Sequence, residues 1–546
     1  MQAAVAARIA SATAMSRMPD SRRAPPRAYR NSALQAAQMV DVLSARIRAA
    51  RQAWTAGHRA EAIQLFDQAV RLEPNNVQAY IVAARSYAER FEFDRMEHTL
   101  EQLVRRAPLH PGVHHYVGET YGMLKLPKRA LASYERAVRL PGGGPPTWME
   151  LASLYERAHR LDEAEELIER TLRAGFDLPL VALVRGRIQR RQERIELAEA
   201  TFRSLLARLP AESEWACQAW GEIALLKDQQ GDADGAVDAI GQCKRMQRSR
   251  QQSHWAASEK LQSFMREMIS TVKRDDFRRW RDQGSGFAPQ RVALLSGFPR
   301  SGTTLLEQVL DSHPDLVSSE ERDFVGNELL RTFTSARGNT PFLDVLNQLR
   351  PSQIEPQRRR YRRFMEYLLD QRIAARMLLD KNPAYNLTIP LMLRVFPETR
   401  IIIALRDPRD VVLSCYLRYL PLNTVSVRFL DVQSTAERYA LDLSAWLKFR
   451  ELIDVPWCEV RYEDVVADLP REARRALDTL GLTWDEGVLN YRQQLADQKQ
   501  VTSPSYAAVA QPIYTQAMGR WKNYARILEP AMETLQPFIQ QFGYDR

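Results

Sequence analysis

Residues 292–306 read VALLSGFPRSGTTLL and join an apolar run, a glycine-containing loop and the start of a helical pattern. The apolar run 292–296 has the length of a buried strand, and the pattern that follows from Thr303 is helical. Four residues separate Gly297 from Gly302, which is the glycine spacing of a nucleotide P-loop at a strand-to-helix junction. Backbone amides and the helix dipole bind anions at such a junction. The stretch therefore predicts an α/β domain with a phosphate-binding loop.

The loop lacks the lysine that an NTPase places directly after its second glycine, because Thr303 occupies that position. Arg300 supplies the positive charge instead, and Ser301, Thr303 and Thr304 supply hydroxyl groups. These features disfavour ATP or GTP hydrolysis and kinase activity. An ordinary tight turn stays open as the alternative to a phosphate-binding loop.

Three more short apolar segments alternate with helical patterns further along the chain: Met377–Leu379, Arg400–Leu405 and Trp457–Arg461. This alternation predicts a parallel sheet with helices on both faces. Such sheets bind ligands at the carboxyl ends of their strands, so we expect the chemistry in the loops that follow these segments.

The N-terminal half of the chain repeats with a period of 34 residues. Two sets of mostly small residues and one set of bulky residues recur in register. The sets are Ala50, Ala84, Gly118, Ala152 and Gly186; Ala62, Met96, Ala130, Ala164 and Ala198; and Phe66, Leu100, Tyr134, Ile168 and Phe202. The pattern resembles tetratricopeptide repeats, in which small residues let paired helices touch and bulky residues fill the space between them. A sixth, irregular unit follows around Gly221 and Ala236, so we predict an all-α repeat solenoid over residues 43–247.

The chain carries 77 basic and 67 acidic residues, a net charge of +10, and all but ten of the basic residues are arginine. Arginine binds phosphates in bidentate fashion, and a phosphate-bearing small ligand accounts for the surplus without a nucleic-acid partner. The four cysteines are far apart in sequence and form no CxxC pair, which disfavours a disulfide scaffold and a zinc site and predicts a cytoplasmic location. No apolar run is long enough for a membrane span. Residues 1–42 are predicted to be a basic, disordered extension, and residues 248–290 a helical connector.

Several motifs in the C-terminal half resemble one enzyme family. Residues 299–304, PRSGTT, are similar to the loop with which sulfotransferases bind the 5′-phosphosulfate of 3′-phosphoadenosine 5′-phosphosulfate (PAPS). Residues 310–314, LDSHP, and the pair Glu320-Glu321 resemble the protein-tyrosine sulfotransferase branch. Residues 406–410, RDPRD, with Ser414, resemble the segment that binds the 3′-phosphate. The whole chain thus resembles a tetratricopeptide-repeat sulfotransferase, with its sulfotransferase domain over residues 291–546.

The resemblance implies roles for the matching residues. Glu321 would be the general base for an acceptor hydroxyl, Lys381 would neutralise charge on the bridging oxygen, and Arg300 would hold the 5′-phosphate. Arg406 and Ser414 would bind the 3′-phosphate, which distinguishes PAPS from ATP. The implied nucleotide contacts are Arg300, Ser301, Gly302, Thr303, Thr304, Arg406, Ser414, Arg418, Tyr462, Ser505 and Arg520. No metal ion is expected, and from composition alone the run 320–323 is a solvated charged surface.

The implied acceptor is a tyrosine of a protein or peptide. Repeat arrays of this kind bind peptides or proteins on their concave face, so recruitment of the acceptor by the array is one interpretation, and support of the neighbouring domain or self-association stays open as the other. In the tyrosine-specific branch an arginine stands two residues after the catalytic glutamate, where this chain has Asp323. A carbohydrate, a lipid or a small phenol therefore stays open as the acceptor. A repeat scaffold with an inactive P-loop domain is the further alternative. We expect residues 43–247 to contribute nothing to nucleotide binding.

Overall fold

The computed structural model describes residues 45–545 apart from residues 57, 73, 75, 335–339 and 494–517. Contacts within the chain divide it into two compact units. The first unit holds the residues up to Leu154 together with Glu166–Asp177, and the second holds Tyr155–Glu165 and everything from Leu178 onward. The second unit therefore contains both the last repeats and the whole of the sheet.

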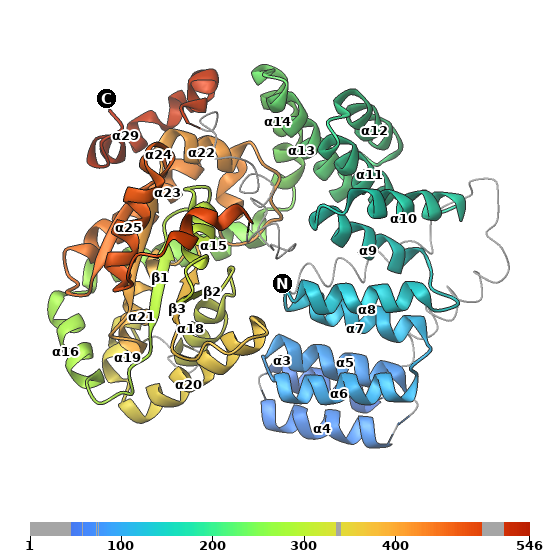
Figure 1. Cartoon of the computed structure of the whole chain (residues 1–546), viewed down its shortest axis with the longest axis horizontal. Helices are drawn as coiled ribbons and strands as arrows, with labels where there is room; N and C mark the ends of the chain where they lie inside the picture. Colours follow the sequence, from blue (N-terminus) through green and yellow to red (C-terminus); the bar gives the residue numbers. More distant parts are fainter. Residues whose placement is uncertain are drawn as a thin grey trace. The chain divides into compact units, whose positions relative to one another are not determined.

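The repeat region consists of consecutive helix pairs (Figure 1). The pairs are α3 (Ala45–Ala56) with α4 (Arg59–Leu72), α5 (Val77–Glu89) with α6 (Phe93–Arg106), α7 (Pro111–Met123) with α8 (Pro127–Arg139), α9 (Pro145–Arg157) with α10 (Leu161–Arg173), α11 (Pro179–Arg191) with α12 (Ile195–Arg208), and α13 (Glu214–Gln229) with α14 (Ala233–Arg248). Every member of the three recurring sets is buried. A Cβ on Gly118 would lie 2.9 Å from the ring of Tyr134, so the bulky residue of the pair occupies the space that the small one leaves. The predicted all-α repeat fold is confirmed.

The C-terminal domain is built on a parallel five-stranded sheet in the order β2-β3-β1-β4-β5. The strands are β1 (Val292–Ser296), β2 (Leu316–Ser318), β3 (Met377–Lys381), β4 (Arg400–Leu405) and β5 (Trp457–Arg461). The predicted α/β fold with a parallel sheet is confirmed. The sequence pattern missed β2, because three residues are too few to show a periodicity. It also ended β3 two residues early, since Asp380 and Lys381 are polar although both are buried.

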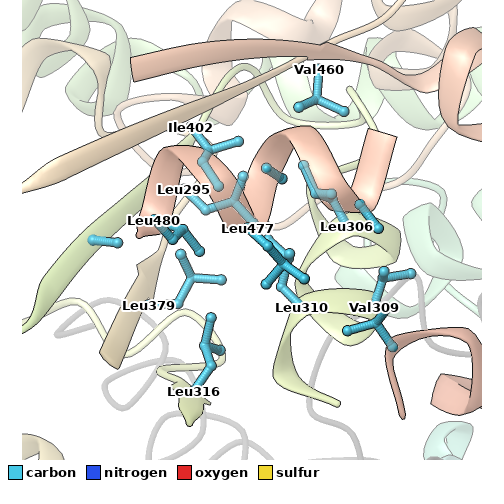
Figure 2. Close-up of a cluster of buried hydrophobic side chains, with 14 of the residues drawn as sticks. Leu295, Leu306, Val309, Leu310, Leu316, Leu379, Ile402, Val460, Leu477 and Leu480 are labelled. Carbon is cyan, nitrogen blue, oxygen red and sulfur yellow. The ribbon is translucent and has the colours of Figure 1, made fainter. Parts of the chain in front are cut away.

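Both faces of the sheet are covered. Figure 2 shows the core on one face, where leucines of α17 (Thr303–Asp311) and α25 (Leu469–Leu480) meet Leu295, Leu379 and Ile402 of the strands. Side chains of β5 alternate between the faces: Val460 points into this core, whereas Trp457 packs at 5.3 Å against Trp446 of α23 (Val432–Arg450). This enclosure leaves the carboxyl ends of the strands as the place for a ligand.

The remaining helices connect these parts. They are α15 (Gln252–Thr271) and α16 (Arg274–Gly284) in the predicted connector, and α18 (Leu330–Thr334), α19 (Phe342–Gln348), α20 (Pro351–Leu368), α21 (Ile389–Val395), α22 (Pro408–Tyr416), α24 (Tyr462–Ala467), α28 (Ala525–Leu528) and α29 (Met532–Gln541) within the C-terminal domain. All four cysteines are buried thiols. Two of them that lie far apart in sequence, Cys217 and Cys243, come together between α13 and α14 with their sulfur atoms 2.8 Å apart.

Candidate functional site

The loop between β1 and α17 depends on its two glycines. Gly302 has a φ of +94°, and a Cβ there would lie 2.8 Å from the ring of Tyr462. A Cβ on Gly297 would collide with the carbonyl oxygen of Ala404 in β4. Both positions therefore admit only glycine, and the turn they permit starts α17 at Thr303, directly after β1. The amino end of this nine-residue helix points its first amides and its positive dipole end toward the loop.

Arg300 joins this loop to the next strand of the sheet. Its backbone is left-handed, with a φ of +76°, and its Nε donates a hydrogen bond of 3.1 Å to the hydroxyl of Ser414 on α22. Arg406, at the end of β4, donates from Nη1 to the carbonyl oxygen of Arg300 at 3.4 Å. The structure thus brings Arg300 to Arg406 and Ser414, which lie more than a hundred positions further along the chain, because β1 and β4 are neighbours.

Four arginines form what we call the arginine cluster: Arg300, Arg406, Arg418 and Arg520. Burial, and then the positive charges of Arg418, Arg406 and Arg520, lower the pKa of Arg300 to about 9. Burial and the charge of Arg520 also lower the pKa of Arg418. Cations that disfavour one another in a buried place are stabilised by an anion between them, so the cluster has the electrostatics of a polyanion site.

Asp410 of α22 fixes the segment that carries Arg520. Its carboxylate accepts hydrogen bonds of 2.8 Å from the amides of both Gly519 and Trp521, the residues on either side of Arg520, and lies 3.8 Å from Arg406. The guanidinium of Arg406 also lies over the ring of Tyr462, 5.0 Å from its centroid. The contacts of Asp410 thus position both Arg406 and Arg520 from one helix, α22.

Arg409 has a different part in the same turn. It donates two hydrogen bonds to Asp407, at 2.9 and 2.7 Å, and its guanidinium stacks 3.9 Å from the ring of Trp521. This ion pair with Asp407 holds the turn at the start of α22.

Lys381 is the centre of a second group, the lysine–carboxylate cluster of Glu307, Glu321 and Lys381. The lysine ends β3 and its side chain is fully buried. Its Nζ lies 2.7 Å from Oε1 of Glu321 and 3.0 Å from Oε2 of Glu307. Burial lowers the pKa of Lys381, but the two carboxylates outweigh it and the net pKa is raised. Lys381 is therefore held as a cation beside the proposed base.

The backbone at the proposed base is strained. Glu320 and Glu321 both have positive φ angles, of 49° and 63°, which non-glycine residues rarely adopt. The turn is fastened by the amide of Glu320, which donates to Glu307 at 3.2 Å, and by the hydroxyl of Ser319, which donates to Asp380 at 3.0 Å. Such a turn directs the Glu321 side chain to Lys381, whereas Glu320 lies 3.9 Å from Arg322 instead.

Sequence reasoning missed Glu307, which is 1% exposed on α17. Burial raises its pKa to about 7, against the opposing effect of Lys381. The hydroxyl of Ser318, on the short strand β2, donates a hydrogen bond to the Glu307 carboxylate. A signal was present: Glu307 follows Leu306 and precedes Leu310 at helical spacing, so a carboxylate interrupts the apolar face of an otherwise buried helix.

The other predicted residues have these places. Ser301, Thr303 and Thr304 are buried in the loop and the first turn of α17, and Ser301 Oγ accepts from the amide of Phe298 at 3.3 Å. The Nε2 of His313 lies 2.9 Å from the carbonyl oxygen of Thr483. Ser505 lies outside the described residues.

No helix in the described part of the chain is long and apolar enough to cross a membrane. Within the same residues, no three or more His, Cys, Asp or Glu side chains are grouped so that they could hold a metal ion.

Comparison with known proteins gives two matches to family models. Residues 293–486 match the model described as "Sulfotransferase family", and residues 47–95 and 149–213 match that of the tetratricopeptide repeat. The first match contains both clusters except Arg520, which lies beyond its end.

Individual relatives are distant. Protein-tyrosine sulfotransferase 1 of Danio rerio is 24% identical over 271 residues, 46% of this chain and 72% of that protein. An omega-hydroxy-beta-dihydromenaquinone-9 sulfotransferase of Mycobacterium tuberculosis is 31% identical over 172 residues, 30% of this chain and 44% of that protein. An uncharacterized protein of Aquifex aeolicus is 25% identical over 263 residues, and only 33% of its length is spanned. Among solved structures, the sulfotransferase domain of a Synechococcus olefin synthase aligns with a TM-score of 0.31 and 21% identity, over 46% of this chain and 94% of that domain.

Proposed function

We propose that this protein transfers a sulfuryl group from PAPS to an acceptor hydroxyl, and that the acceptor is the hydroxyl of a protein or peptide tyrosine. The match of residues 293–486 to the sulfotransferase family model supports the proposal. The observation that carries the proposal is the partly buried arginine cluster beside the loop between β1 and α17. We propose that the catalytic domain spans residues 291–546.

The arginine cluster fits a donor with phosphate groups at both ends of its ribose. Arg300 and the first amides of α17 would hold the 5′-phosphosulfate, and Arg406 with Ser414 would hold the 3′-phosphate. Burial and then the charges of the neighbouring arginines lower the pKa of Arg300, and this supports the assignment, since a polyanion would offset that repulsion. Arg418, Tyr462, Ser505 and Arg520 complete the proposed nucleotide contacts.

The transfer itself would be an in-line displacement. The acceptor oxygen attacks the sulfur, the bond from sulfur to the bridging phosphate oxygen breaks, and 3′-phosphoadenosine 5′-phosphate (PAP) leaves. Glu321 would accept the proton of the hydroxyl, which it can do only as a carboxylate. The hydrogen bond of 2.7 Å from Lys381 to Glu321 supports that state, and the same cation would stabilise negative charge on the bridging oxygen.

The acceptor assignment rests on the motifs at residues 310–314 and 320–321 and on the similarity to protein-tyrosine sulfotransferases. A second candidate is a lipid or small-molecule hydroxyl, favoured by the 31% identity to the sulfotransferase of a hydroxylated menaquinone. Asp323 supports this second candidate: it accepts a hydrogen bond of 2.7 Å from the Tyr385 hydroxyl and places a carboxylate where an acidic peptide needs a cation.

Calorimetric titration of the full-length protein with PAP and with ADP tests the donor. PAP should bind at least tenfold more tightly, because ADP lacks the 3′-phosphate, and equal affinities would contradict a PAPS site. Incubation with PAPS and either a tyrosine peptide or a small phenol, followed by mass spectrometry of both acceptors, then decides between the two acceptor classes.

A further inference from the structure

The last helix pair of the repeat array packs against the segment that carries Arg418. Lys244 Nζ on α14 donates a hydrogen bond of 2.8 Å to the carbonyl oxygen of Arg418, and Gln247 Nε2 donates one of 2.7 Å to that of Leu420. A Cβ on Gly221 of α13 would lie 2.5 Å from the Cβ of Tyr419. The last helix pair thus contacts three successive residues after α22, two through side-chain hydrogen bonds and one through close packing against Gly221.

The same helix pair supplies negative charge to the arginine cluster. Asp228, near the end of α13, lies 3.0 Å from the Nη2 of Arg520 through its Oδ1 and accepts a hydrogen bond of 2.7 Å from the Tyr524 hydroxyl. Burial, Arg520 and Arg190 lower the pKa of Arg418, and the carboxylates that oppose them are Asp228 and Glu222, both on α13. Two of the four clustered arginines therefore have their counter-charges on a repeat helix.

We propose that this last repeat is part of the nucleotide site, with Asp228 as a positioning residue for Arg520 and the α14 side chains Lys244 and Gln247 as positioning residues for Arg418. The inference rests on the proposed function, because it takes the arginine cluster as the PAPS site. An arginine held by an ion pair has its side-chain entropy reduced before the phosphate arrives, which favours binding. The expectation that residues 43–247 take no part in nucleotide binding is thereby revised for α13 and α14.

The direction in which one substitution changes the Kd for PAP distinguishes a positioning role from simple charge balance. Asp228→Asn removes a negative charge near the arginines, which by electrostatics alone would tighten the binding of an anion. Loss of positioning acts in the opposite direction, so we expect the Kd for PAP to rise about 5- to 20-fold in the full-length variant. Asp238→Asn, at an exposed position of α14, makes the same charge change away from these contacts, and its Kd for PAP should stay within about twofold of the parent protein's. Equal or tighter binding by Asp228→Asn would overturn the proposal.

A double-substitution cycle then tests whether Asp228 acts through Arg520. In an Arg520→Ala background, Asp228→Asn should have no further effect on the Kd for PAP, whereas a general structural defect would add its full cost. Additive effects would overturn the positioning role.

Gln247→Leu changes no charge and tests the positioning role of the last repeat even if Asp228→Asn does not fold. It removes the hydrogen bond to the Leu420 carbonyl and a long contact of 4.0 Å from the Cys243 thiol. PAP binding should weaken about three- to tenfold, and the thermal unfolding midpoint without nucleotide is measured in parallel. Unchanged PAP affinity in this folded variant would contradict the inference. Failure of the unsubstituted protein to bind PAP would contradict the proposed function. If the unsubstituted protein binds PAP and the variants bind it equally well, only the positioning role of the last repeat is contradicted.

Discussion

The arginine cluster and the lysine–carboxylate cluster lie at the ends of neighbouring strands and solve opposite electrostatic problems. In the arginine cluster, buried like charges lower the pKa of Arg300 to about 9. In the lysine–carboxylate cluster, one buried lysine bridges two carboxylates at 2.7 and 3.0 Å, and its pKa is raised. The first cluster gathers like charges, whereas the second pairs a cation with carboxylates. In the proposed function, the first cluster would therefore bind the nucleotide and the second would transfer the proton.

The largest effect should come from breaking the second cluster at Glu321. Glu321→Gln keeps the side-chain size and removes the charge that accepts a proton, so turnover with PAPS should fall by roughly 10²–10⁴-fold. The Kd for PAP should hardly change, because the arginine cluster is intact. Glu320→Gln is the matched control and should keep nearly full turnover. A Glu321→Gln enzyme of normal activity would return this residue to the solvated charged surface.

Stability should respond to pH through the buried carboxyls of the same region. Burial raises the pKa of Glu307 to about 7 and that of Asp380 to about 7, well above their values in an unfolded chain. Between about pH 4.5 and 7 the native protein therefore keeps protons that the unfolded chain releases, and its free energy of unfolding falls as pH rises, by about 3 kcal/mol for each such group.

Urea unfolding at several pH values checks this. The Glu307→Gln variant should lose part of the slope between pH 4.5 and 7, since its amide does not titrate. Parallel curves for the variant and the parent protein would show that Glu307 does not titrate in this range.

A smaller effect should follow in the arginine cluster from Arg406→Ala. Loss of a charged hydrogen bond to the 3′-phosphate should weaken PAP by about 1.5–3 kcal/mol, or roughly 10- to 150-fold. Adenosine 5′-phosphosulfate has no 3′-phosphate and should lose much less affinity, which titration of both ligands measures. Equal losses for the two ligands would remove Arg406 from the proposed role and blur the division between the clusters.

Features that depend on neighbours in sequence were predictable from it. The 34-residue period located the buried positions of the helix pairs, because a helix repeats its faces locally and each pair packs mainly on itself and its neighbours. The strand–loop–helix at residues 292–306 was also predictable, since Gly297 and Gly302 are required by the local turn and by the strand beside it. The residues of the loop also showed that it lacks the lysine that contacts a γ-phosphate and that Arg300 is its cation.

Features that depend on charge compensation were not predictable in this way. No sequence spacing connects Glu307 to Lys381 or Asp228 to Arg520, and each pair meets only when strands and helices far apart in the chain become neighbours. The strand β2 could not be predicted either, because three residues are too few to show a periodicity. It forms because β3 pairs with it in the sheet.

Gly221 shows both sides of this division. The sequence placed it in the sixth, irregular unit of the array, and earlier units have a small residue, such as Gly118 against Tyr134, that faces a bulky side chain of its own pair. Only the tertiary structure decided that its neighbour is Tyr419, one residue after Arg418. The sequence by itself determined the repeat fold, the parallel sheet and the composition of the loop, because hydrophobic periodicity and glycine geometry act over a few residues. The partners of each buried charge were decided by the tertiary structure, since a charge taken out of water is stabilised by whichever groups the fold brings within a few ångströms.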